Sequence, residues 1–176
     1  MSDPDDPPAK DSHRVDRLPA TAHDRVVPGR PTRGAVGGGW AGRYGVPPAP
    51  WGWHPSSERG NGKLWAFAGD AVSPLDAEGL GLRILRTRQE HWKPSTNAVQ
   101  RFGGAATRNV VVLHGDEAAR FARGDDQDLQ RWDGDWGYVI AAHDLAGGTE
   151  PIGVGLYLHG ELRSTVPKGR REDLES

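Results

Sequence analysis

Residues 151–171, PIGVGLYLHGELRSTVPKGRR, carry the clearest structural pattern in the chain. Apolar side chains recur at every second position in its first half, which is typical of a half-buried β-strand. His159-Gly160 supplies a turn, and residues 161–166 alternate again until Pro167. The stretch therefore predicts a β-hairpin, and because a lone hairpin is only marginally stable in water, other segments must cover it. The apolar residues on its predicted inner face are Ile152, Val154, Leu156 and Leu158.

Local patterns predict the segments that provide this cover. The predicted strands are residues 63–68, 80–85, 109–113 and 137–142. A helix is expected from the cap residue Ser95 to about Phe102, and another from the cap residue Asp116 to Gly124. The second of these presents Ala118, Ala119, Phe121 and Ala122 as its apolar face.

A third helix, over residues 31–44, is less favoured by its own residues. Gly34 and Gly37-Gly38-Gly39 lie inside it, and each glycine costs roughly 1 kcal/mol relative to alanine. If this helix forms, the packing of Trp40 and Tyr44 must hold it.

Composition limits the architecture and the chemistry. Only 35% of the 176 residues are hydrophobic, which fits a polar tail and a modest core better than one uniform domain. The acidic, proline-containing residues 1–28 cannot bury enough apolar surface to order themselves, so we expect a disordered tail. The chain has no cysteine, which excludes disulfides, thiolate metal sites and a cysteine nucleophile. No apolar run approaches the ~20 residues of a membrane span, and no secretory signal is present, so we expect a cytoplasmic protein.

Charge is distributed unevenly along the chain. Residues 83–108 contain six basic residues and one acid, whereas residues 116–135 contain seven acids and three arginines. A basic band beside an acidic band suits an electrostatic binding surface, and two ordinary solvated faces are the alternative.

Within the basic band, residues 86–94 (RTRQEHWKP) surround one tryptophan with cationic or imidazole groups. Such interleaving suits phosphates and a stacked base. The alternative is a polar strand end with a packed Trp92. Trp51 and Trp53, in a predicted loop, have the same two interpretations, stacking on bases or ordinary packing.

No motif nominates a catalytic centre, a metal site or a cofactor. The aspartate-rich stretch 124–135 has the alternation of a calcium loop at Asp126 and Asp128, but the glycine and the final glutamate are misplaced. The histidines lack zinc-motif spacing. A phosphate-binding glycine loop and a nucleophile elbow are also absent from the sequence. We therefore predict no catalytic residue, no metal and no cofactor.

The order of segments carries a resemblance to a known family. NVVVL at 109–113, DEAARFARGDD at 116–126, GYVIA at 137–141 and the hairpin at 151–171 follow one another as in a PUA-type RNA-binding domain. The C-terminal half most resembles the RNA-binding region of Sun-type RNA cytosine-5 methyltransferases, in which the strand ends in a lysine-glycine-arginine turn. Lys168, Gly169 and Arg170 match that turn.

The upstream half is similar to the segment that precedes PUA domains in those enzymes and in related ribosome-biogenesis factors. The matching pieces are RYGVPP at 43–48, SSERGNGKLWAFAGD at 56–70 and GLGLRILRTRQEHWKPSTNAVQRFG at 79–103. Residues 31–171 as a whole resemble a small family of stand-alone haloarchaeal proteins. The glycine-rich stretch 34–39 departs from the helix expected there.

The resemblance implies an α+β protein in three parts: a tail over 1–28, a pre-PUA-like α+β domain over 29–105 and a PUA-like β-barrel over 106–176. Sun-type enzymes use cysteine and a separate S-adenosylmethionine domain, for which this chain has neither the residue nor the room. The expected function is therefore non-catalytic binding of structured rRNA or tRNA, in support of a separate RNA-modifying enzyme or of a ribosomal particle. The predicted RNA contacts are Arg86, Arg88, His91, Lys93, Arg163, Lys168, Arg170 and Arg171.

Two other functions compete with RNA binding. The tryptophans and the basic turn at 168–171 would also suit a protein-interaction module that docks an acidic partner. A hydrolase is the weakest alternative, because no paired acid and base is visible in the sequence.

Overall fold

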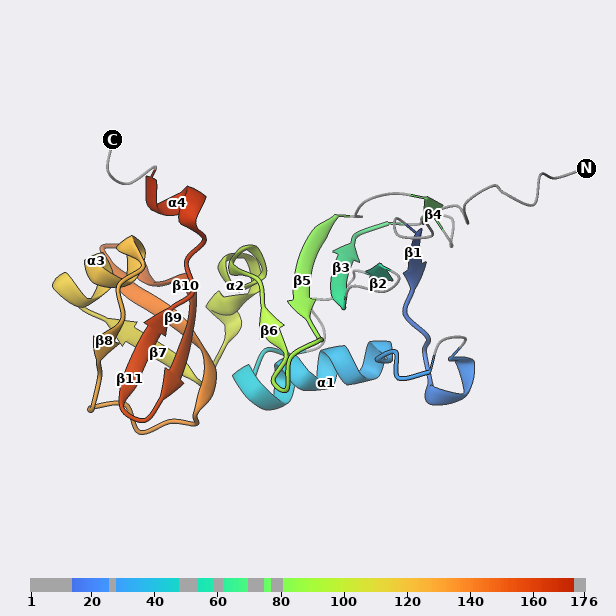
Figure 1. Ribbon diagram of the computed structural model, residues 1–176, viewed down its shortest axis with the longest axis horizontal. Coiled ribbons are helices and arrows are strands. Elements are labelled where there is room, and N and C mark those ends of the chain that lie inside the picture. The colour runs from blue at the N-terminus through green and yellow to red at the C-terminus, as the bar shows by residue number, and fades with distance from the viewer. Residues whose placement is uncertain are drawn as a thin grey trace, which may run out of the picture.

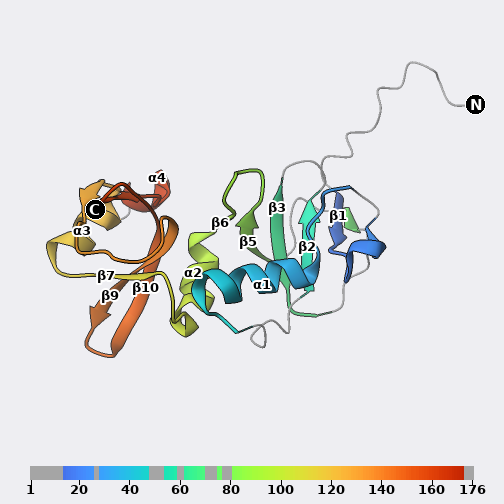
Figure 2. The same cartoon turned by 90° about the horizontal axis from the view of Figure 1, so that it is seen from below.

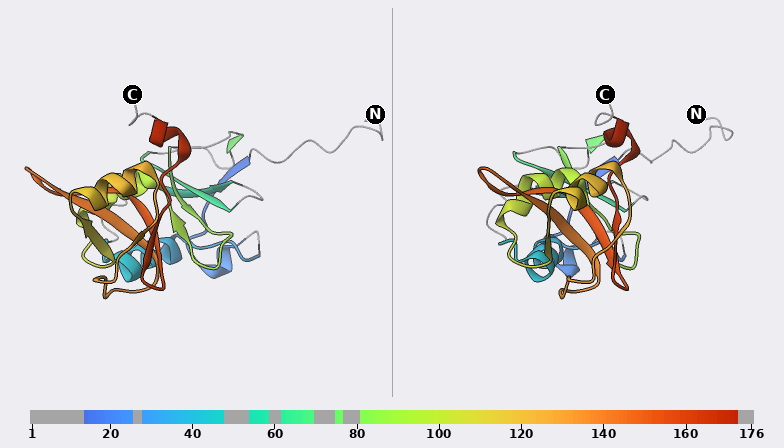
Figure 3. Two further views of the ribbon diagram at one scale, coloured as in Figure 1. Left: turned by 60° about the vertical axis from the view of Figure 1, so that its left-hand side comes forward. Right: turned by 90° about the vertical axis from the view of Figure 1, so that its left-hand side faces the viewer.

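Two β-sheets and the helices packed on them make up the fold, an α+β architecture (Figure 1). The computed structural model describes residues 14–25, 28–47, 54–58, 62–69, 75–76 and 81–172. The first sheet has the strand order β4-β1-β2-β3-β5-β6 and the second the order β7-β9-β10-β11-β8. The curl of the second sheet is visible in Figure 3. The predicted fold class, α+β with a barrel-like domain, is confirmed.

The first sheet contains six strands. Their bounds are β1 Arg14–Arg17, β2 His54–Glu58, β3 Lys63–Phe67, β4 Leu75–Asp76, β5 Leu82–Arg86 and β6 Lys93–Pro94. The second sheet comprises β7 Val110–Leu113, β8 Gln127–Asp128, β9 Gly137–Leu145, β10 Gly148–Leu158 and β11 Glu161–Ser164. The α-helices are α1 Arg33–Tyr44, α2 Thr96–Phe102, α3 Asp116–Arg123 and α4 Lys168–Glu172, with 3-10 turns at η2 Ala22–Asp24 and η3 Gly103–Ala105.

The predicted C-terminal hairpin is β10 and β11, joined at residues 159–160 with Leu158 opposite Glu161. Its predicted half-buried pattern is wrong, because both faces of β10 are covered. Val154 packs with the first sheet's core and Tyr157 with the core under α3. A register shift between Pro151 and Gly153 breaks the simple alternation that the sequence suggests.

The glycines of the Pro-Ile-Gly-x-Gly stretch make room for α3. A Cβ atom on Gly153 would lie 3.0 Å from the Phe121 ring, and one on Gly155 would lie 2.6 Å from Leu162 and 3.3 Å from Phe121. Phe121 is fully buried. The two glycines therefore allow the ring of Phe121 to approach the strand backbone closely.

Helix α1 forms despite its glycines. The Thr32 side chain accepts a hydrogen bond from the Ala35 amide, and Gly45, at φ 67°, closes the helix in the left-handed region. Val36, Trp40 and Tyr44 bury one face, as the interpretation of residues 31–44 requires. Figure 2 shows α1 lying across one face of the first sheet.

The prediction of a disordered tail over residues 1–28 is wrong for its described part. Strand β1 pairs with β2 and β4, and Val15 and Leu18 are buried. Arg30 forms an ion pair with Asp16 at 3.3 Å. A four-residue strand with one buried side chain gives too little alternation to be recognised, whereas the tertiary pairing supplies its stability. Residues 1–13 lie outside the described part of the chain.

Several other predicted elements are close to those observed. Helix α2 begins after the cap Ser95 and buries Ala98, Val99 and Phe102, as predicted. Helix α3 is capped by Gly115 instead of Asp116, and it buries Ala118 and Phe121 only. The predicted strand over 80–85 is β5, at residues 82–86.

The two halves of the molecule share a core. Ile140 and Val154 of the second sheet pack in the same apolar cluster as Trp40 and Val99. The boundary expected at 105/106 lies between β6 and β7, the last strand of one sheet and the first strand of the other. Because the cluster crosses this point, the position of one sheet on the other is set by packing.

Candidate nucleic-acid interface

A basic cavity of about 460 Å³ lies where β5, β6 and the start of α2 meet the segment that follows β11. We call it the basic pocket. Its cationic side chains are Arg83, Arg86, Lys93 and Arg170, and no described residue that lines it carries a carboxylate. The remaining lining residues are Pro94, Ser95, Thr96, Asn97, Thr165 and Pro167.

A β-bulge brings Arg83 and Arg86 to the same cavity. In a regular strand, residues three apart point to opposite faces. In β5, Leu85 pairs with Leu64 while Arg83 pairs with Trp65, which leaves Ile84 as the extra residue. Ile84 and Leu85, which are consecutive in the sequence, are therefore both buried. The arginines before and after them, Arg83 and Arg86, both line the pocket.

Lys93 reaches the pocket from β6, where it pairs with Arg86 of β5. Its Nζ atom lies 5.7 Å from the centre of the Tyr138 ring, a cation–π contact between the two sheets. The next turn is fixed by Ser95, whose hydroxyl bonds to the Arg83 carbonyl and accepts from the Ala98 amide.

Arg170 enters the pocket from α4, across the boundary between the two halves. Its guanidinium donates to the side-chain oxygen of Gln100 at 3.1 Å and to that of Asn97. Both acceptors are neutral amides on α2, so these bonds position Arg170 without neutralising its charge.

The cations of the basic pocket repel one another. Burial, then the charge of Arg86, lowers the pKa of Arg83. Burial, then Arg86 and Arg83, lowers the pKa of Lys93. The ion pairs between described residues are Arg30–Asp16, Arg43–Asp135, Arg123–Asp125, Arg131–Glu117 and Arg163–Glu161, none of which involves a cation of this pocket. A bound anion would therefore relieve an unfavourable cluster of charge.

Three of the eight predicted contacts meet in this pocket: Arg86, Lys93 and Arg170. Sequence reasoning missed Arg83, because the Ile84 bulge that turns it toward Arg86 leaves no local mark in the sequence. The basic segment after Pro167, predicted as a turn, is helix α4.

The other predicted contacts are not brought into the basic pocket. Arg88 is exposed and its side chain lies against Gly62. Lys168 is exposed at the first position of α4. Arg163 is exposed and pairs with Glu161 at 2.6 Å, within its own strand. Arg88 follows the end of β5, Arg163 belongs to β11 and Lys168 begins α4, and none of the three lines the basic pocket.

Arg171 makes contacts within the protein. Its Nε atom donates to the Val166 carbonyl at 3.0 Å, and its guanidinium packs against Gly124 at the end of α3. Prediction of this residue as an RNA contact is therefore not supported by the geometry. His91 lies instead at a second cavity, described next.

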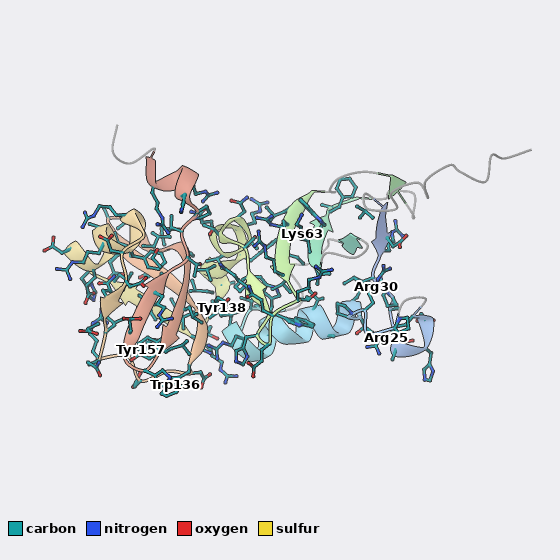
Figure 4. All side chains as sticks on the ribbon, viewed as in Figure 1. Arg25, Arg30, Lys63, Trp136, Tyr138 and Tyr157 are labelled. Carbon is teal, nitrogen blue, oxygen red and sulfur yellow. The ribbon has the colours of Figure 1, made fainter. Side chains whose placement is uncertain are left out.

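A second cavity, of about 440 Å³, is lined mainly by aromatic side chains. We call it the aromatic pocket. Its aromatic side chains come from both halves of the chain: Trp40, Tyr44, His91, Trp92, Trp136 and Tyr138. Figure 4 shows Tyr138 near the middle of the molecule and Trp136 at the lower rim of the second sheet. The predicted stacking tryptophans Trp51 and Trp53 lie outside the described residues.

The described residues contain no group of three or more histidine, cysteine or acidic side chains arranged to hold a metal ion. The calcium-loop interpretation of residues 124–135 thus gains no geometric support. Within the same described ranges, no helix has both the length and the apolar character needed to cross a membrane.

Comparison with protein families gives a match over the first part of the chain. Residues 1–81 match the model of a family described as "Family of unknown function (DUF7122)". The matched segment contains α1 and the first four strands, and ends before the residues of the basic pocket. No curated protein matches the chain.

Proposed function

We propose that the chain is a non-catalytic RNA-binding protein that acts on rRNA or tRNA, with backbone phosphates held in the basic pocket. The observation that carries this proposal is the meeting of four cations around one cavity without a described carboxylate. Arginine and lysine are the side chains that neutralise nucleic-acid phosphates. The resemblance of pieces within residues 43–171 to the pre-PUA and PUA regions favours RNA among polyanions.

The position of the basic pocket supports a polymeric ligand. Its cations come from β5, β6 and α4, which belong to both halves of the molecule. The Lys93–Tyr138 contact links it to an aromatic pocket, and the combination of cations with aromatic rings is typical of proteins that bind unpaired nucleotides. In this proposal the protein positions RNA for a separate modifying enzyme or for ribosome assembly.

A protein-interaction module is the second candidate, because the same cations would also bind acidic side chains. It requires carboxylates where RNA offers phosphates, and it gives the aromatic pocket no necessary role. Binding measurements with RNA and with an acidic peptide separate the two.

The test compares two variants of equal charge. Arg86→Gln/Lys93→Gln removes two cations from the basic pocket, whereas Arg120→Gln/Arg123→Gln removes two exposed cations from α3. Fluorescence anisotropy with labelled tRNA and with fragments of 16S rRNA, over a range of salt concentrations, gives the affinity and its salt slope. We expect the pocket variant to bind at least about tenfold more weakly, with a salt slope reduced by about 1 to 2.

The α3 variant should retain most of the wild-type affinity. Equal losses in both variants would show general attraction to positive charge and contradict the pocket as the site. Failure of the wild-type protein to bind any of these RNAs, with retained binding of a polyglutamate peptide, would favour the protein-interaction module.

A further inference from the structure

The aromatic and basic pockets share no lining residue, and one contact between two side chains links them. Lys93 lines the basic pocket and Tyr138 lines the aromatic one, and their cation–π contact spans 5.7 Å. Tyr138 also lies within the electrostatic influence of Arg86, whose charge opposes the rise in the Tyr138 pKa that burial causes. A phosphate bound beside Lys93 would therefore lie near the ring of Tyr138.

The walls of the aromatic pocket are held in place before any ligand binds. The Arg43 guanidinium, on α1, donates to the Trp136 carbonyl at 2.9 Å and to the Tyr138 carbonyl at 2.9 Å. The Tyr44 hydroxyl donates to the same Tyr138 carbonyl at 3.2 Å. These bonds fix the start of β9, which carries Tyr138 and directly follows Trp136. Binding of a planar ligand would therefore lose little conformational entropy in this backbone.

Two rings at this pocket are positioned by their neighbours. Trp92 lies against α1 at Gly39, where a Cβ atom would be 3.7 Å from the indole. Trp136 is 57% exposed, and the ring of His159 meets it edge-on at a centroid distance of 4.5 Å. An exposed tryptophan held by a second ring at the rim of a cavity is suited to stacking.

Polar groups at the pocket favour one class of ring. Glu90 lines the cavity as an exposed carboxylate, and no ion pair or hydrogen bond of its side chain with a described residue is found. The Tyr138 hydroxyl already donates to Gln89 at 2.7 Å. A carboxylate accepts hydrogen bonds from an exocyclic amino group, whereas the carbonyl of uracil at the same position would be repelled.

Building on the proposed function, we infer that the aromatic pocket receives one unstacked base of the RNA strand whose phosphates lie in the basic pocket. The base stacks on Trp136 and the neighbouring rings, and Glu90 favours bases with an exocyclic amino group over uracil. The site thus couples backbone binding to a preference at a single nucleotide.

The experiment uses the full chain and short RNA probes. The first probe is an octamer of uridines with a single 2-aminopurine, the second has an abasic residue at that position, and the third and fourth carry cytosine or uracil there. We expect binding to quench 2-aminopurine fluorescence. Wild-type protein should prefer the cytosine probe to the uracil probe by several fold, and the base-containing probes to the abasic one by about tenfold.

Variants assign these effects to residues. Trp136→Ala should abolish the preference for a base over the abasic residue while the abasic probe binds as before. Glu90→Gln should reduce the preference for cytosine over uracil, and Leu145→Ala, at an exposed position that is 54% accessible and outside both pockets, should change neither.

Equal weakening by Trp136→Ala with the base-containing and the abasic probes would contradict the inference. Unchanged binding by that variant, while Arg86→Gln/Lys93→Gln still weakens every probe, would overturn the base site and leave the proposed function in place. Absence of binding to all probes and to the longer RNAs would overturn both proposals.

Discussion

The Nζ atom of Lys93 lies 5.7 Å from the centre of the Tyr138 ring, and this contact joins the two halves of the chain. Lys93 belongs to the edge strand β6 of the first sheet, and Tyr138 to β9 of the second. Each lines a different cavity. The packing of one sheet on the other therefore sets the distance between the cationic and the aromatic parts of the surface.

RNA affinity should fall at alkaline pH because of Lys93. Burial, then Arg86 and Arg83, holds the pKa of Lys93 below its ordinary value of 10.5. Lys93 consequently loses its proton earlier than an exposed lysine as pH rises. We expect the affinity for oligoadenylate, whose bases do not ionise in alkaline solution, to decrease by several fold as pH rises toward the ordinary lysine value of 10.5.

Lys93→Arg provides the comparison, because arginine remains charged throughout this range. Its affinity, measured by anisotropy at the same pH values, should stay nearly constant. An identical decline in the wild-type protein and in Lys93→Arg would show that another group titrates.

The same crowding should make Lys93 costly for stability. A lysine whose pKa is lower in the folded protein than in the unfolded chain destabilises the fold while it is charged; this cost is full below the folded pKa and disappears as pH rises to the unfolded value of about 10.5. Lys93→Met keeps an unbranched side chain and removes the charge. At pH 7 its Tm should exceed that of the wild-type protein by about 1–3 °C.

The exposed Lys168, changed to Met in the same way, should leave the Tm within about 1 °C of the wild type. Lys93→Met should therefore gain thermal stability and lose RNA affinity at the same time. A fall of several degrees in the Tm of Lys93→Met would contradict the charge repulsion deduced for this pocket.

Tyr44 should control alkaline unfolding. Burial raises the pKa of its phenol from 10.0 to about 12, and its hydroxyl donates to the Tyr138 carbonyl. Because the folded state holds the neutral phenol, its contribution is full below pH 10 and is lost as pH rises through 12. The loss amounts to about 2–3 kcal/mol in the free energy of unfolding.

Urea unfolding at pH 8 and at pH 11.5 measures this effect in the wild-type protein and in Tyr44→Phe. The phenylalanine variant should lose less stability between the two pH values. Parallel losses would mean that other groups govern the alkaline transition.

The close approach of α3 to β10 should make Gly155 intolerant of a side chain. Gly155→Ala places a Cβ atom 2.6 Å from Leu162 and 3.3 Å from Phe121, both of which are fully buried. We expect a loss of about 1–3 kcal/mol in the free energy of unfolding, measured with urea. Gly147→Ala, where no atom lies within 4 Å, should be nearly neutral. Equal stability of the two variants would contradict the packing of Phe121 on the strand.

The elements that could be predicted have strong local signals. Residues 95–102 combine a serine cap with apolar positions at helical spacing, and the hairpin around residues 159–160 combines alternation with a turn. Strand β1 has one buried valine among charged residues, so only its pairing with β2 and β4 reveals it. The burial of both faces of β10 likewise depends on α2 and α3, which pack against this strand.

The candidate site was predictable in composition and not in geometry. The cations of residues 86–93 indicated an anion-binding surface from sequence, and Arg86 and Lys93 do meet there. Arg83 joins them through the bulge at Ile84, which is a property of strand pairing. Arg171 is basic like Arg170, but its side chain bonds to the Val166 carbonyl and does not line the basic pocket.

Crosslinking in native cells, followed by sequencing of the bound RNA, tests the proposed RNA-binding function most directly. The wild-type protein, Arg86→Gln/Lys93→Gln and Arg120→Gln/Arg123→Gln would be expressed at equal levels. We predict a discrete rRNA or tRNA peak for the wild-type protein and the α3 variant, and its loss in the pocket variant. Absence of enrichment over background in the wild-type protein, or an undiminished peak in the pocket variant, would contradict RNA binding through the basic pocket.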